Sequence, residues 1–571
     1  MMNEFINISP RFTHSGSPVA GQLGKSMSTD FLPQFVTWSW VVLVLSSLLQ
    51  CTLFFSAANL LAVGYVVVAW SLLTIFILRS SVVNSYPISC FFLVSFTLSQ
   101  LYFPLVFTLI EGKKLVFNLE LPNELFLHAV LSLIVLLIVH GLYRSISGQH
   151  KKVGKAGPKL LNRLGLFDVP TDQQIWIIGF FGLAAAFYTY FIDPTKILDP
   201  NKNVQESFVG SKFIQGFVPY MYAPFFIPSG RMYGQQRSSG PMLIPKLVLY
   251  TLLLFVVSIG ANSRGAFMLG FTSLGFTLGL GMLLNVLRIK LFTIKNIGFG
   301  LLMMWLFTGP IADLGTAMVM VRGSRLVLSK PELIEQTWEA FQQKEAIKLF
   351  RQQNTLQGED WDEYYLDNIF LARFCNLKFN DASLMLAHQV GQQNLDMLDF
   401  TVKHTLATLP TPLLNAMGFT FNKIQIQSSS YGDYLYYLAT SDPEALGGFR
   451  TGHYIGTSMA AFGWWYLLVL AIGVIPIYIL CDLLFVRVPT QIQTDNDLPH
   501  YAPKFSLCGL MSLTPIFQLL AYESLEVVVS FPLRGWIQLV LLYVLVFQLS
   551  RLISRLLPMG NLSNNSLNQP G

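Results

Sequence analysis

The sequence predicts an all-α fold: a polytopic transmembrane bundle of about twelve helices with a large helical periplasmic insert late in the chain. Hydrophobic residues make up 53% of the 571 residues and charged residues only 12%, about half of what a soluble domain carries. The apolar residues also come in unbroken runs. At about 1.5 Å per helical residue, such runs are long enough to cross roughly 30 Å of hydrocarbon. A chain of this kind needs lipid as its solvent.

The expected transmembrane helices follow these apolar runs along the chain. They are 36–56, 59–78, 88–110, 125–143, 174–192, 213–229, 246–262, 265–287, 296–311, 459–482, 505–521 and 535–553. The segment 213–229 is the weakest of them, because Pro219, Pro224 and Pro228 would kink it or make it re-entrant. If it does not cross the membrane, every later span is inverted.

The basic residues of the short loops predict the orientation, since cytoplasmic loops carry the excess of Lys and Arg. The loop 144–173 holds six basic residues against two acidic ones, so we place it in the cytoplasm. One assignment then puts every basic loop inside. It also puts both termini in the cytoplasm and residues 312–455 outside the membrane.

This assignment divides the chain into five parts. They are a disordered cytoplasmic tail (1–34), transmembrane helices (35–311), an extracytoplasmic helical insert (312–455), further transmembrane helices (456–556) and a disordered tail (557–571). The insert has 11 basic against 16 acidic residues, in a chain whose total charge is +6. We expect its first helix at a capping box that begins with Ser329. Further helices are expected near 361–377 and 395–408, with Asp381 as an N-cap between them.

Few residues inside the predicted spans are suited to chemistry. His128 and His140 lie near the ends of one span, where imidazole can reach the interface or have a structural role. The five cysteines form no CxxC pair, and no P-loop, HExxH or dinucleotide-binding fingerprint occurs. We therefore expect no metal, no cofactor and no nucleic-acid partner.

Cationic residues instead collect at the outer ends of the predicted spans. Arg264 lies in a short turn between two spans, and Arg322 follows the ninth. Arg450 and His453 immediately precede another span, while Arg534 lies at the mouth of the last. Each arginine alone is explained by pairing with acids of the insert or with lipid phosphate. As a group they indicate a site for a phosphorylated lipid, because guanidinium can bind phosphate through two parallel hydrogen bonds.

Four segments near these residues resemble the oligosaccharide repeat-unit polymerases, the Wzy type of O-antigen polymerase. They are Asn262–Gly265, Asp313–Arg322, Asn368–Asp381 and Thr451–Thr457, the last leading into Ala461–Gly463. Arg264 and Gly275 also match an RX10G spacing described for some members. The expected topology, many spans with a large periplasmic loop late in the chain, is similar as well.

This resemblance implies an inverting, metal-independent glycosyl transfer at the outer face of the bacterial inner membrane. The growing glycan would leave undecaprenyl diphosphate and join the next lipid-linked repeat unit, and a flippase and a chain-length regulator would be partners. His453 is the candidate base, and Arg264 is the second catalytic candidate. The substrate-binding candidates are Arg322, Arg373, Arg450, Arg534 and Tyr454.

Two other functions stay open. A flippase or carrier for lipid-linked saccharides would use the arginines as a headgroup site without bond chemistry, and it predicts basic residues within the spans. An O-antigen ligase-like enzyme, or another lipid-dependent glycosyltransferase, would share the architecture. However, His453 stands ten residues before Gly463 and lacks the His-Asn start expected of a ligase.

Overall fold

The computed structural model places most of the chain. It describes residues 30–148, 159–192, 209–235, 242–260, 264–289, 293–321, 330–356, 362–368, 370–448, 450–489, 501–521 and 523–556. These residues are mainly helical, as predicted. The strands among them are β1 (Phe485–Pro489) and β2 (Tyr501–Phe505), which form one antiparallel hairpin. The two predicted tails lie almost wholly outside the described residues.

Seven helices in the described part of the chain are long and apolar enough to cross a membrane. They are Phe31–Leu53, Ala57–Phe76, Pro87–Ile110, Pro122–Ser147, Asp172–Ile192, Tyr454–Asp482 and Val527–Leu556. The chain is therefore a multi-pass membrane protein. Further apolar helices are shorter, so the count of twelve spans stays a prediction.

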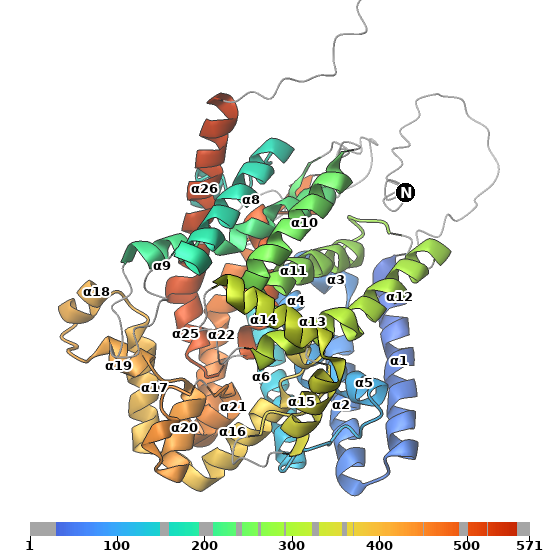
Figure 1. The fold of residues 1–571 in the computed structure, drawn as a ribbon, viewed down its shortest axis with the longest axis vertical. Coiled ribbons are helices and arrows are strands. Elements are labelled where there is room, and N and C mark those ends of the chain that lie inside the picture. Colours follow the sequence, from blue (N-terminus) through green and yellow to red (C-terminus); the bar gives the residue numbers. More distant parts are fainter. Residues whose placement is uncertain are drawn as a thin grey trace, which may run out of the picture.

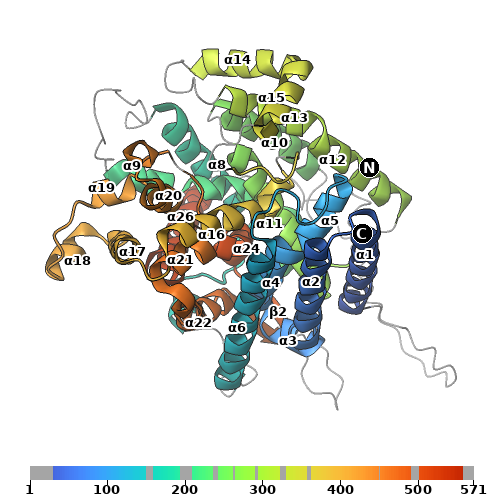
Figure 2. The same ribbon diagram turned by 90° about the horizontal axis from the view of Figure 1, so that it is seen from below.

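The helices up to residue 320 form the larger part of the bundle. In chain order they are α1 (Phe31–Leu53), α2 (Ala57–Phe76), α3 (Ser80–Ser85), α4 (Pro87–Thr97), η2 (Leu98–Tyr102), α5 (Phe103–Ile110), α6 (Pro122–Gly148), α7 (Lys159–Arg163), α8 (Asp172–Phe187), η3 (Tyr188–Ile192), α9 (Val209–Gln215), η5 (Val218–Tyr233), α10 (Leu243–Gly260), α11 (Arg264–Leu283), α12 (Ile294–Thr308) and α13 (Pro310–Met320). Figures 1 and 2 show α1 and α2 at one edge and α9 at the other.

The predicted span 213–229 is not a continuous α-helix. Most of it belongs to η5, a 3₁₀-helix that contains Pro224 and Pro228 and departs from helical geometry at Ser229. Proline lacks the N–H that an α-helix requires, which explains the irregular backbone. Most of η5 is buried, and its Tyr220–Met221 backbone packs directly on Gly182 of α8. Irregular backbone is tolerated at membrane depth where protein covers it in this way.

The C-terminal part of the bundle is also interrupted. Its helices are α21 (Tyr454–Phe462), η9 (Gly463–Trp465), α22 (Tyr466–Asp482), α23 (Leu507–Met511), α24 (Leu513–Phe517), η10 (Leu519–Ala521), α25 (Val527–Ser530), η11 (Phe531–Gly535) and α26 (Trp536–Leu556). The predicted span 505–521 is thus a series of short, mostly buried helices. A π-helical turn, η11, joins α25 to α26 and carries Arg534.

The insert is helical. Its elements are α14 (Lys330–Gln342), α15 (Lys344–Leu356), η7 (Ala372–Phe374), α16 (Leu377–Val390), α17 (Leu395–Ala407), α18 (Thr411–Ala416), α19 (Lys423–Gln427), α20 (Tyr431–Thr440) and η8 (Pro443–Ala445). Its part from α16 to α20 lies at one end of the bundle, whereas α14 packs on α10 and α13. Helix α16 packs on α21 and α6, and α17 packs on α21 (Figure 1). We call this end of the bundle the insert end. The predicted helix near 395–408 is confirmed, and Ser329 lies outside the described residues.

The predicted helix near 361–377 is wrong, because a loop between two spans binds this segment instead. The Glu111 carboxylate accepts hydrogen bonds from the backbone N–H groups of Asp367 (2.8 Å) and Asn368 (2.9 Å). These donors are therefore not available to a helical ladder. Asp381 is likewise not an N-cap. It lies inside α16, fully buried, and accepts hydrogen bonds from the backbone of Glu120 and Leu121.

Gly456 allows α21 to approach α16 closely. A Cβ at Gly456 would overlap the backbone of Ser383. We expect Gly456→Ala to destabilise the protein by about 1–3 kcal/mol, the usual cost of overpacking. Gly275→Ala in α11 is the matched control, because its Cβ would meet nothing within 4 Å. Thermal unfolding of both variants in detergent tests this, and equal unfolding temperatures would contradict it.

Candidate functional site

The arginines predicted to bind substrate do not all lie within the described structure. Arg322 lies outside the described residues, and Arg264 begins α11 in a stretch whose side chains are not described. Arg373 lies on η7 and is exposed. The predicted convergence of Arg264 with other arginines therefore stays a prediction.

Arg450 is bound within the insert. Its Nη1 lies 3.6 Å from Asp433 Oδ1 and donates to the Ala445 carbonyl at 3.0 Å. Its guanidinium also stacks over the Tyr436 ring, 4.3 Å from the centroid. This is the pairing with an acid of the insert that explains a single arginine. Arg450 thereby fastens α20 to the segment that leads into α21.

His453 and Tyr454 are fully buried at the start of α21. His453 is the N-cap, and its Nδ1 accepts the N–H of Ile455 at 3.4 Å. Burial lowers the pKa of His453 to about 3, so its imidazole is neutral at physiological pH. A general base must reach the substrate proton. The covered side chain gives the predicted catalytic role of His453 no support.

Arg534 instead belongs to a group of cations contributed by three elements. Its Nη1 donates to the Thr408 carbonyl at 3.5 Å, and Lys423 Nζ donates to the next carbonyl, Leu409, at 2.7 Å. Burial lowers the pKa of Lys423, and the charges of Arg534 and of Lys212 on α9 lower it further. Arg534 and Lys212 are exposed. We call Lys212, Lys423 and Arg534 the basic cluster.

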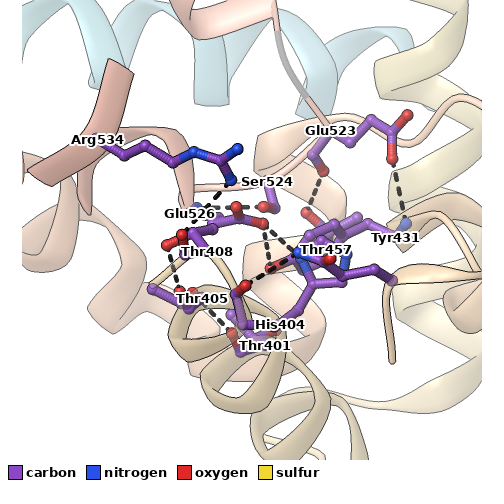
Figure 3. A network of polar contacts seen from close by, with 12 residues as sticks. Thr401, His404, Thr405, Thr408, Tyr431, Thr457, Glu523, Ser524, Glu526 and Arg534 are labelled. Carbon is purple, nitrogen blue, oxygen red and sulfur yellow. Dashed lines mark hydrogen bonds and ion pairs between the residues drawn. The ribbon is translucent and has the colours of Figure 1, made fainter. Parts of the chain in front are cut away.

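A carboxylate and an imidazole pair beside Arg534 of the basic cluster (Figure 3). His404 Nδ1 of α17 lies 2.6 Å from Glu526 Oε2, and Tyr431 OH donates to the same oxygen at 3.0 Å. The side chains of His404 and Glu526 are 17% and 15% exposed. Thr408, the carbonyl partner of Arg534, follows His404 by one helical turn. We call His404 and Glu526 the acid–imidazole pair.

Glu523 completes this network. Its Oε2 accepts the backbone N–H of Tyr431 at 3.1 Å, and its carbonyl accepts the Thr457 hydroxyl at 2.8 Å (Figure 3). Burial raises the pKa of the Glu523 carboxyl to about 6, although the Tyr431 N–H opposes the shift. The charge of Asp433 raises this pKa further.

The raised pKa of Glu523 predicts that stability falls as the pH rises. The folded state holds this proton more tightly than the unfolded chain, whose carboxyl has a pKa near 4.5. Between about pH 4.5 and 6 the protein therefore loses stability, by at most about 2 kcal/mol. Glu523→Gln should remove this loss and unfold at a higher temperature than the wild type at pH 8. Parallel pH profiles for the two proteins would contradict the prediction.

A second polar network lies at the opposite end of the spans. Asp482, the last residue of α22, accepts hydrogen bonds from Ser89 Oγ (2.8 Å) and Tyr143 OH (3.0 Å). Ser89 Oγ also lies 3.1 Å from His140 Nε2. His128, nearer the insert end, contacts Tyr466 OH at 2.8 Å. Both histidines are fully buried within the protein, and these contacts agree with a structural role.

The residues of the basic cluster and the acid–imidazole pair are distant in sequence, and only Arg534 was predicted. A weak signal was present, since Glu523 and Glu526 stand between two apolar segments. Within the described part of the chain, no three His, Cys, Asp or Glu side chains gather as metal ligands would. Comparison of the chain with protein-family models, curated proteins and solved structures finds no match.

Proposed function

We propose that this chain is a glycosyltransferase that polymerises oligosaccharide repeat units carried on undecaprenyl diphosphate, at the outer face of the bacterial inner membrane. The observation that carries the proposal is the basic cluster beside the acid–imidazole pair at the insert end. Cations suit a diphosphate, and a carboxylate-bound imidazole suits proton transfer. The resemblance to Wzy-type polymerases points to the same reaction.

The chemistry requires little more than such a site. A diphosphate is already a good leaving group, so the protein must mainly stabilise its negative charge and position an acceptor hydroxyl. Arg534 lies in η11, two residues before α26, in the segment Val527–Leu556 that is apolar enough to cross a membrane, while Lys423 begins α19 of the insert. A lipid-linked diphosphate bound between them would keep its tail in lipid and its glycan in water.

The chain length of the surface glycan tests this function. Cells that lack the protein should carry surface glycan capped with one repeat unit, because transfer of single units does not need polymerisation. Restoring the gene should restore a ladder of longer chains on a gel. A complete ladder without the protein would reject the proposal.

A carrier for lipid-linked saccharides is the second candidate, and the buried Asp482 network favours it. Asp482 is the last residue of its span, and ionisable residues buried in a transmembrane bundle are costly and commonly mark a transport pathway. A carrier deletion should leave no repeat unit on the surface, whereas a polymerase deletion leaves one. The same gel therefore separates the two functions.

The side of the membrane on which the site lies is a further prediction. A reporter fused after residue 160 should read cytoplasmic, since this loop is basic. A reporter fused near residue 390 should read periplasmic. Cytoplasmic activity near residue 390 would mean that the segment 213–229 does not cross, and it would place the basic cluster on the wrong side for an exported glycan.

A further inference from the structure

The acid–imidazole pair has the geometry of an oriented base. A carboxylate 2.6 Å from His404 Nδ1 holds the ring proton on that nitrogen, which leaves the lone pair on Nε2. The rings of Phe400 and Tyr431 pack against the imidazole, with centroids 5.5 Å and 4.7 Å away. These contacts keep the ring in one orientation. A base held in this way needs no rearrangement when a substrate proton arrives.

The pair also lies at the right place relative to the cations. Thr408, the C-cap of α17, follows His404 by four residues. Their Cβ atoms therefore lie on the same side of the helix end, about 5–6 Å apart. The Thr408 carbonyl holds Arg534, and the Leu409 carbonyl holds Lys423. The anomeric carbon of the donor is joined to the diphosphate through a single bridging oxygen, so it lies close to the phosphate that the cations would hold. A diphosphate on the cations would therefore present its anomeric carbon near His404.

We propose that His404 Nε2 is the general base of the polymerisation reaction and that Glu526 is its positioning residue. This inference rests on the proposed function. The acceptor hydroxyl oxygen forms a bond to the anomeric carbon of the donor glycan. The bond from that carbon to the phosphate oxygen breaks, and its electron pair leaves with undecaprenyl diphosphate. The hydroxyl proton moves to His404 Nε2. The anomeric centre is inverted, and the basic cluster holds the released diphosphate.

The groups around the pair determine how its activity depends on pH. Tyr431 OH donates to Glu526, and the Glu523 carboxylate accepts the backbone N–H of the same tyrosine. Arg534 faces the pair across Thr408. A protonated His404 cannot accept the substrate proton, so the rate should fall on the acidic side. Burial raises the pKa of Glu523 to about 6, so Glu523→Gln is a necessary reference for that fall.

Three variants separate a base from a structural contact. His404→Asn keeps an N–H donor near the position of Nδ1 and removes Nε2. Glu526→Gln can donate to His404 and so favours the wrong tautomer. His388→Asn is the matched control, because His388 is a half-exposed histidine of the same insert that pairs with Glu124. The full-length proteins, in nanodiscs, are given the lipid-linked repeat unit extracted from cells that lack the protein.

We expect His404→Asn to lower the rate of polymerisation about 10²- to 10⁴-fold and to remove the acidic fall in rate. Added imidazole should restore part of the activity, which a purely structural loss would not allow. Glu526→Gln should lower the rate at least about 100-fold with little change in the KM for the lipid-linked unit. His388→Asn should match the wild type, as should the unfolding temperature of His404→Asn.

The outcomes distinguish this inference from the function on which it rests. An active wild type with an equally active His404→Asn protein would overturn the assignment of the base and leave the polymerase function intact. A loss that imidazole does not rescue, together with an unchanged pH profile, would also overturn it. A wild type that makes no polymer from the lipid-linked unit would overturn both.

Discussion

The Arg534→Lys protein should make little or no long polymer, although its positive charge is kept. Arg534 is exposed on a π-helical turn, with one N–H group on the Thr408 carbonyl. The other donors of its planar fork can bind two phosphate oxygens at once, which a lysine ammonium cannot do. Loss of one charged hydrogen bond costs about 1.5–3 kcal/mol, so the rate should fall roughly 10- to 100-fold. Arg534→Ala should fall further.

Gel analysis of the surface glycan, at matched amounts of each protein, measures this effect. Arg551→Lys is the control. Arg551 lies near the far end of α26, the helix that follows Arg534, and it pairs with Asp168 there. Its ladder should reach full length. A full-length ladder from Arg534→Lys would show that the basic cluster does not bind the diphosphate through a guanidinium fork.

Much of the helical fold follows from hydrophobic runs alone. Six of the seven long apolar helices begin and end within five residues of the predicted bounds, because lipid demands an unbroken apolar stretch of that length, while Val527–Leu556 begins eight residues before the predicted 535. The departures occur where protein replaces lipid as the environment. The segment 505–521 is apolar enough to be read as a span, yet it forms short helices that other elements bury. Hydropathy does not distinguish burial in protein from burial in lipid.

The insert was harder to predict, since its local signals compete with distant partners. The segment 361–377 has the composition of a helix, but Glu111, more than 250 residues away, binds its backbone. Arg450 and His453 were predicted to belong to the site from their residue types. In the structure, Arg450 binds the Ala445 carbonyl and His453 caps α21. A sequence shows which residue types are present, while their partners depend on tertiary packing.

The candidate site was predicted only at Arg534 for the same reason. His404, Tyr431 and Glu526 come together from α17, α20 and the start of α25 (Figure 3). No local spacing connects them, and each alone is an ordinary polar residue of the insert or of a loop. The acid–imidazole pair therefore becomes visible only when these helices are packed on one another.

Among the residues of the insert, Asp381 should contribute most to holding the insert on the transmembrane bundle. It is fully buried in α16, and its carboxylate accepts the N–H groups of Glu120 and Leu121 as well as Lys378 Nζ at 3.1 Å. Lys378 is buried too and donates to the Asn118 carbonyl. Asp381→Ala would leave two backbone donors without their acceptor, and the nearest carboxylate left to the lysine charge would be Asp362, 4.0 Å from Lys378 Nζ. Removing one partner of a buried ion pair costs about 3–5 kcal/mol.

The expected result is a lower unfolding temperature in detergent and faster proteolysis of the segment that joins α15 to α16. Asp399→Ala is the control, because the ion pair of Asp399 with Lys403 on α17 is largely exposed and is worth at most about 1 kcal/mol. Lys378→Met together with Asp381→Leu removes both charges and should recover part of the stability, since no buried charge is then left unpaired. If Asp381→Ala unfolds at the same temperature as Asp399→Ala, this carboxylate does not hold the insert on the bundle.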